Sequence, residues 1–200
     1  MDDRKTFLLE MYNQMFADIN RHIMVVWQSI GVIGGAIALL ALAEKKLLPV
    51  DYAVAFIVAV CFWSINTIID SAYWYNRNLV IIANIERQFL GTDDIKEIQF
   101  YFAKHRAPRM IKHLFIQFVL VLSILSIFFV YHLFSSVAPG IAQNALSMEA
   151  FLPWLVAVLL AAYSVHLWRD RKEPYKNFLR YSPGKDVKSD ISSVPGHRTE

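Results

Sequence analysis

The residues most able to do chemistry in this chain are uncharged polar residues inside long apolar runs. At membrane depth, amide and hydroxyl side chains either hydrogen-bond to neighbouring helices or line a water-filled path. We favour contacts between helices, and the lining of an oligomeric pore stays open as the sharper alternative. The candidates are Gln28, Ser64, Asn66, Thr67, Gln117, Ser123 and Ser126.

Motifs for catalysis or for binding a cofactor are missing from the sequence. There is no His-x-x-x-His pair, no cysteine cluster and no glycine-rich phosphate loop. The single Cys61 lies within an apolar run, so we expect it to pack rather than react. His113 and His132 stand about 28 Å apart along one helical run, too far to share a metal. We therefore predict no catalytic site, cofactor or metal, and a protein that is not an enzyme.

The polar candidates lie in four runs that contain no charged residue, at 23–43, 52–69, 114–134 and 151–168. Each is close to the roughly 20 residues that an α-helix needs to cross a bilayer. A composition with 56% hydrophobic and 18% charged residues is too apolar for a soluble domain of this length. The sequence predicts an all-α integral membrane protein with four transmembrane helices. No run contains a carboxylate, which disfavours ion-coupled transport.

The distribution of Lys and Arg predicts the orientation. The segment before the first run, the segment between the second and third runs and the C-terminal tail hold 18 of the 20 basic residues. We expect a multi-pass protein of the bacterial inner membrane. Because basic loops resist translocation, both termini and the middle segment should lie in the cytoplasm. The net charge of +3 follows from this placement, and we expect no nucleic-acid partner.

Helical patterns continue outside the runs. The pattern after the second run reaches Leu90, Gly91 suits a helix cap, and a further helix over about 95–106 would complete a cytoplasmic hairpin. Residues from 182 onward have no apolar period and are expected to be disordered. The predicted parts are a cytoplasmic amphipathic helix (1–22), a first transmembrane hairpin (23–69) and the cytoplasmic helical hairpin (70–113). A second transmembrane hairpin (114–168) and a basic, partly disordered cytoplasmic tail (169–200) follow.

A heptad pattern in the middle segment predicts a packing seam. Its residues are Tyr75, Asn78, Ile82, Ile85 and Phe89, at steps of three and four. An Asn within such a seam lowers stability but selects register and oligomeric state. The seam could meet the apolar stripe of residues 8–19 or a second copy of itself, and both stay open.

A strip of small residues in the first run predicts close helix packing. Gly31 and Gly35 are four residues apart, and Ala38 continues the same face. Such a strip lets another helix backbone approach closely, but it does not identify the partner.

The stretch "FWSINTIIDSAYWYNRNLVIIANIERQFLG" is similar to the end of the second span in small prokaryotic membrane proteins of the SLATT and RipA-like groups. The residues that carry the resemblance are Trp63, Asn78, Ile85 and Glu86. The resemblance covers about 30 residues around the second run and includes no catalytic motif. It implies an oligomeric membrane protein and, in several cases, a membrane-disrupting effector of antiphage (antiviral) defence.

Two functions follow as expectations. The first is a homo-oligomeric inner-membrane protein that acts as a pore-like or membrane-perturbing effector. The alternative is a non-conducting scaffold or sensor that recruits a cytoplasmic protein partner. In both, the lipid bilayer and further copies of the chain are the expected partners.

Overall fold

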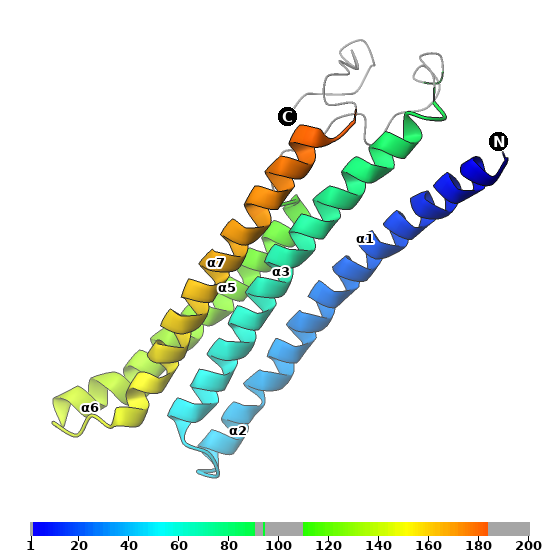
Figure 1. The fold of residues 1–200 in the computed structure, drawn as a ribbon. Coiled ribbons are helices and arrows are strands. Elements are labelled where there is room, and N and C mark those ends of the chain that lie inside the picture. The colour runs from blue at the N-terminus through cyan, green and yellow to red at the C-terminus, as the bar shows by residue number, and fades with distance from the viewer. Residues whose placement is uncertain (1, 91–93, 95–109, 184–200) are drawn as a thin grey trace. The chain divides into compact units, whose positions relative to one another are not determined.

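The computed structural model describes residues 2–90, 94 and 110–183, and this part of the chain contains helices and no strand (Figure 1). The all-helical prediction is therefore confirmed for the described residues. The longer helices are α1 (Asp2–Ile37), α3 (Val50–Glu86), α5 (Lys112–His132) and α7 (Leu152–Tyr181). Shorter elements are α2 (Leu39–Glu44), a π-helical turn (Leu133–Val137), α6 (Ala138–Ala142) and a 3-10 turn (Met148–Phe151).

Among the described residues, four helical stretches are long and apolar enough to cross a membrane. They are Asp3–Glu44, Val50–Glu86, Lys112–Ala142 and Met148–Tyr181. Each contains one of the four predicted runs, so the predicted number of potential spans is confirmed. Since the stretches hold 31 to 42 residues, each is longer than the roughly 20 that a hydrocarbon core requires.

Helix α3 is continuous through the apolar run and the polar residues after it. It contains no Pro or Gly, and its 37 residues extend over about 55 Å. The prediction placed its end at Leu90, whereas the helix ends at Glu86 and closes with a tight turn in which the Gln88 N–H donates to the Ile85 carbonyl at 2.9 Å. The predicted Gly91 cap and the predicted helix over 95–106 lie outside the described residues.

Two helical stretches extend beyond the predicted apolar runs. The third continues past residue 134 to Ala142, because Pro139 occupies the first turn of α6, where its missing N–H costs least. The fourth continues past residue 168 as α7 to Tyr181. Pro174 removes one hydrogen bond within α7, but Tyr175 next to it is buried and fixes the helix by packing.

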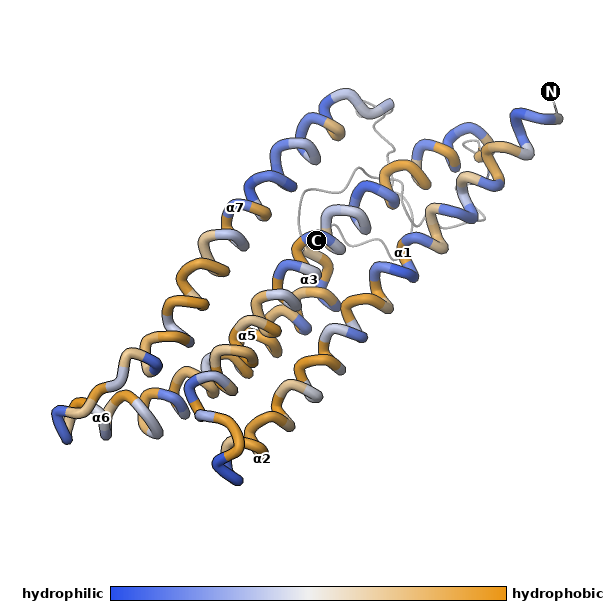
Figure 2. The backbone as a smooth tube through the Cα atoms, turned by 60° about the horizontal axis from the view of Figure 1, so that its bottom comes forward, coloured by the Kyte–Doolittle hydropathy of each residue, from blue (hydrophilic) through white to orange (hydrophobic). Residues whose placement is uncertain are grey.

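The chain forms two compact units. We call residues 23–72 and 110–171 the apolar unit, and residues 1–22, 73–109 and 172–200 the extension unit. Figure 2 shows the corresponding change in hydropathy, since the start of α1 and the end of α7 are mostly hydrophilic whereas α5 is mostly hydrophobic.

Helix α3 forms the centre of the apolar unit. More than half of its most apolar window is buried (56%), against 17 to 28% for the other three stretches. Figure 1 shows this part of α3, in cyan, between α1 and α7. Apolar side chains fill the core around it, mainly Val26, Ile33, Val54, Ile57, Val58, Cys61, Leu114, Val121, Leu125 and Phe128.

Candidate functional site: polar side chains within and beside the helices

Two serines join α1 to α3 inside the apolar unit. Ser29 and Ser64 are fully buried, and their Oγ atoms are 2.8 Å apart. Because the Ser29 hydroxyl donates to the Val26 carbonyl at 2.7 Å, the Ser64 hydroxyl must donate to Ser29. Ser64 is therefore a contact between helices of one chain. Ser29 was not among the predicted site residues, although it lies in the first apolar run directly after the candidate Gln28.

Gln117 lies on the inward stripe of α5, among apolar residues. It is 3% exposed, and its amide nitrogen is 3.3 Å from Nε2 of His113. The Trp27 ring of α1 packs 6.0 Å from the His113 ring. Among the described residues, the Gln117 carbonyl oxygen has no hydrogen-bond partner. This position also points to contacts between helices of one chain.

The remaining hydroxyl candidates bond to their own helices. Thr67 donates to the Trp63 carbonyl at 2.9 Å, Ser123 to Val119 at 2.9 Å and Ser126 to Leu122 at 2.8 Å. Such back-bonding satisfies a hydroxyl without a second helix or water. Asn66 differs, because its buried Oδ1 has no partner among the described residues. The seven candidates therefore do not form one polar row in the chain, since some are buried in its core and others are exposed.

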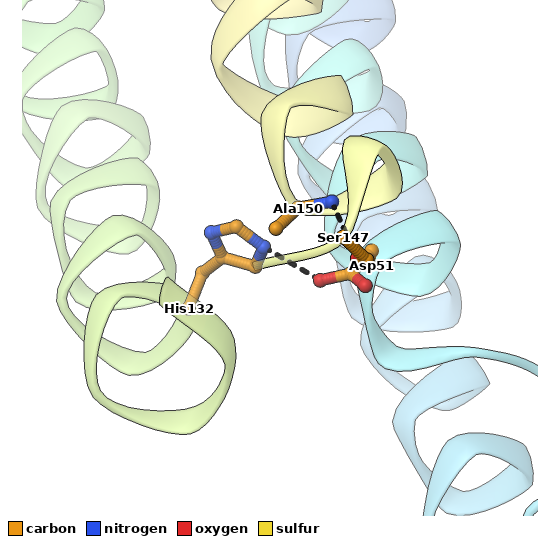
Figure 3. A network of polar contacts seen from close by, with 4 residues as sticks. All are labelled: Asp51, His132, Ser147 and Ala150. Carbon is orange, nitrogen blue, oxygen red and sulfur yellow. Dashed lines mark hydrogen bonds and ion pairs between the residues drawn. The ribbon is translucent and has the colours of Figure 1, made fainter. Parts of the chain in front are cut away.

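A buried His–Asp pair lies at the end of the apolar unit where α3 begins and α5 ends (Figure 3). Nε2 of His132 is 2.9 Å from Oδ1 of Asp51; the His132 side chain is 0% exposed and that of Asp51 is 14% exposed. The Trp154 ring of α7 lies 6.3 Å from the imidazole. Asp51 belongs to the first turn of α3, where the helix dipole favours a carboxylate.

Sequence reasoning missed this pair. It used His132 only to reject a metal site and treated Asp51 as a loop residue. The signal was available, because the predicted topology puts the start of the second span and the end of the third at the same side of the membrane. Beside the pair, Ser147 accepts the Ala150 N–H at 3.3 Å and caps the 3-10 turn that leads into α7 (Figure 3).

An ion pair between Asp70 and Arg171 joins α3 to α7 near the opposite end of the apolar unit. Oδ1 of Asp70 and Nε of Arg171 are 2.8 Å apart, and both side chains are about one-third exposed. A pair that is this exposed contributes little stability, typically about 1 kcal/mol or less. Its main consequence is that two oppositely charged residues just beyond the apolar runs neutralise each other.

The small-residue strip on α1 is not packed within the chain. Gly31, Gly35 and Ala38 are exposed, and a Cβ atom added at either glycine would meet nothing within 4 Å. Gln28 lies one turn before Gly31, is exposed, and has no hydrogen-bond partner among the described residues. The strip is therefore a free surface of the single chain.

The predicted seam is buried inside the extension unit. Asn78 is 2% exposed and Ile82 is 0% exposed, and Ile85 is also buried. Tyr75 is half-buried, and Phe89 at the end of the seam is 41% exposed. The buried Asn78 Nδ2 has no hydrogen-bond partner among the described residues.

Helix α1 contacts α3 on either side of the seam. The His22 ring of α1 stacks on the Trp74 ring at 6.2 Å, and the Tyr12 hydroxyl of α1 donates to Glu86 at 3.3 Å. At about 100° per residue, all five seam residues fall within the sector of about 120° between Trp74 and Glu86. The seam thus lies on the side of α3 that carries contacts with α1, the first of the two partners left open by the sequence.

Glu86, which accepts the hydrogen bond from Tyr12 of α1, is an ionisable residue of this contact between α1 and α3. Burial raises the pKa of its carboxyl above the ordinary value, while the Tyr12 hydrogen bond and the charge of Arg87 oppose the change. A raised acid pKa favours the protonated form in the folded state. The contribution of Glu86 to stability is therefore fully present below the pKa of an unfolded Glu and is lost as the pH rises through the folded pKa.

We expect Glu86→Gln to raise the midpoint of thermal unfolding at pH 8, because the amide still accepts a hydrogen bond from Tyr12 without a buried charge. The gain should shrink as the pH falls towards about 4, where the carboxyl of the wild-type protein is also neutral. Glu173→Gln is the control of opposite sign, since Lys176 lowers the pKa of the exposed Glu173 carboxyl. A gain from Glu86→Gln that does not depend on pH would contradict the burial argument.

Among the described residues, no three His, Cys, Asp or Glu side chains form a group that could hold a metal ion. The chain matches no protein-family model, no curated protein and no solved structure. The described part of the chain defines a helical protein in which four helices are long and apolar enough to cross a membrane.

Proposed function

We propose that the protein is a homo-oligomer of the bacterial inner membrane whose copies join through α1, and that the oligomer is a pore-like or membrane-perturbing effector of the antiphage type. The observation that supports oligomerisation most directly is the free surface formed by Gln28, Gly31, Gly35 and Ala38. The antiphage role rests on the resemblance of the Trp63 to Glu86 region alone.

The chemistry of this surface suits a second copy of the chain. An amide in hydrocarbon without a partner is unfavourable, whereas two Gln28 side chains from two copies can each donate to and accept from the other. The glycines allow the backbones to approach closely, which gains van der Waals contact that lipid tails do not supply. Gln28 and the two glycines on one face of α1, with Ala38 directly after the helix, therefore support self-association.

The position of any permeation path follows from the core. Since apolar side chains fill the apolar unit around α3, a path through one chain is disfavoured. A pore of this protein would form between copies, and assembly would control its opening.

We expect Gly35→Leu to abolish or weaken the oligomer without unfolding the chain. No atom outside the local helix lies within 4 Å of the added Cβ, and Leu is a better helix former than Gly by roughly 0.8 kcal/mol. Native mass measurement in mild detergent would report the number of copies, and thermal unfolding would report the fold.

Val25→Phe is a matched control, because Val25 is exposed on the same helix about a quarter turn from the strip. It should keep the oligomer. An unchanged oligomer in Gly35→Leu, with unchanged thermal stability, would show that the strip faces lipid and would remove the main support for the proposal.

The proposed orientation makes a separate prediction. Reporter fusions after Gly91 and after Tyr181 should report the cytoplasm, and a fusion after Gln143 should report the periplasm. The reason is that 18 of the 20 basic residues lie in the segments predicted to be cytoplasmic. A periplasmic signal from the Gly91 fusion would contradict the four-span topology.

A second function, a non-conducting scaffold or sensor, is favoured by a different observation. The hydroxyls of Thr67, Ser123 and Ser126 bond to their own helices and need no water. In this case the extension unit would recruit a soluble protein. A voltage-sensitive dye in expressing cells separates the two functions: depolarisation that Gly35→Leu prevents supports the effector, and a normal potential at high expression supports the scaffold.

A further inference from the structure

Arg77 of the extension unit has an unusual environment. Its guanidinium carbon lies 5.2 Å from the centre of the Trp74 ring and 5.5 Å from the centre of the Phe178 ring. Both distances are within the range of cation–π contact. The side chain of an α3 residue is thus held by one ring of its own helix and by one ring of α7.

The rings around this contact are themselves fixed. The His22 ring of α1 stacks nearly parallel to Trp74, with an interplanar angle of 2°. The Tyr73 ring packs edge to face against the buried Tyr175 ring of α7 at 6.2 Å. Three helices of the extension unit therefore contribute aromatic or imidazole rings near Arg77, so its position does not depend on one flexible contact.

The hydrogen-bonding capacity of Arg77 is unused among the described residues. Its contacts there are the two rings, and no carboxylate or other acceptor of the described part bonds to it. A cation–π contact holds a guanidinium through its charge and does not use its N–H donors. Arg77 therefore keeps donors that a bidentate anion can accept, and phosphate oxygens match the geometry of the guanidinium fork.

The sequence position of Arg77 indicates the source of the phosphate. Arg77 follows Asp70 by seven residues on the same helix, which is about 10 Å of helix beyond the predicted span. The headgroup region extends roughly 5 to 8 Å beyond the hydrocarbon on each side of a bilayer. Because an Arg side chain can reach back over several ångströms, its guanidinium can reach the headgroups of the leaflet.

We propose that Arg77, held between Trp74 and Phe178, binds the phosphate of an anionic phospholipid headgroup in the cytoplasmic leaflet. Binding there would tie the extension unit to the membrane surface in an effector and in a scaffold alike. The inference uses the predicted cytoplasmic orientation but does not require that the protein conducts or oligomerises.

The test measures lipid binding by the purified full-length protein in a neutral detergent. Dioleoylphosphatidylglycerol is the anionic probe and dioleoylphosphatidylcholine the zwitterionic one, with retained lipid followed by native mass spectrometry and by thermal unfolding. We expect the wild-type protein to retain phosphatidylglycerol preferentially, and Arg77→Gln to lower this affinity about tenfold, the loss typical of one charge-assisted contact. Arg77→Lys should recover only part of it, because an ammonium keeps the charge and loses the fork.

Arg180→Gln is the matched control, because Arg180 is an exposed Arg of the same unit on α7. Equal losses in Arg77→Gln and Arg180→Gln would overturn the proposal in favour of general electrostatic attraction. Equal retention of the two lipids by the wild-type protein would also overturn it. If inorganic phosphate protects the wild-type protein against thermal unfolding as well as phosphatidylglycerol does, the lipid assignment is wrong and the site serves a soluble phosphate.

Phe178→Leu removes one of the two ring contacts of Arg77 and leaves the charge of Arg77 in place. This variant should therefore also weaken phosphatidylglycerol binding.

Discussion

Asp51→Ala is expected to lower the free energy of unfolding of the apolar unit by about 1 to 3 kcal/mol, the cost of leaving a buried polar group without its hydrogen bond. The physical reason is the burial of its partner, since the His132 side chain is 0% exposed. Without the carboxylate, the imidazole keeps its place among apolar rings and loses its one hydrogen bond in the described structure. Unfolding in mixed detergent micelles, followed by tryptophan fluorescence or circular dichroism, would measure the loss.

A double-mutant cycle isolates the pair from other effects. Asp51→Ala and His132→Leu are each expected to destabilise the unit, and the double variant should lose less than the sum of the two. Asp51→Asn is the conservative control, because its amide oxygen can still accept a hydrogen bond from the imidazole. Strict additivity of the two losses would show that the 2.9 Å contact contributes nothing to stability.

Ile82→Asp is expected to have the other large effect, unfolding the extension unit while leaving the apolar unit helical. Ile82 is 0% exposed, so the new carboxylate would be buried without a partner, at a cost of several kcal/mol. Hydrogen exchange or limited proteolysis would detect the loss of protection in residues 1–22 and 73–90.

Two variants of the same seam make this prediction specific. Asn78→Leu should stabilise the unit by about 1 to 3 kcal/mol, because it removes a buried amide nitrogen that has no partner among the described residues. Phe89→Asp should be tolerated, since Phe89 is 41% exposed. If Phe89→Asp disrupts the protein as severely as Ile82→Asp, the whole seam is an interface between copies and not a contact with α1.

The helix pattern was determined by the sequence for a simple physical reason. A charge-free run of about 20 residues must be helical in a membrane, because every backbone group needs a partner within the segment. The continuous helix through Asp70 and Arg77 was equally readable, since no Pro or Gly interrupts it before Gly91. The apolar runs ended at residues 134 and 168, whereas the helices continue past them through Pro139 and Pro174.

Which faces meet was decided only by the tertiary structure. The heptad steps identify a seam at Asn78 and Ile82, but α1 and a second copy offer similar apolar stripes. Only the fold places Tyr12 and His22 of α1 against Glu86 and Trp74, on either side of that seam. The pairing of Asp51 with His132 joins residues 81 positions apart, and no local spacing specifies such a contact. The glycine strip shows the converse, because small residues at steps of four indicate close packing, whereas the fold leaves Gly31 and Gly35 uncovered. Periodicity determines which residues share one face of a helix. Only the packing of all the helices determines which element that face contacts.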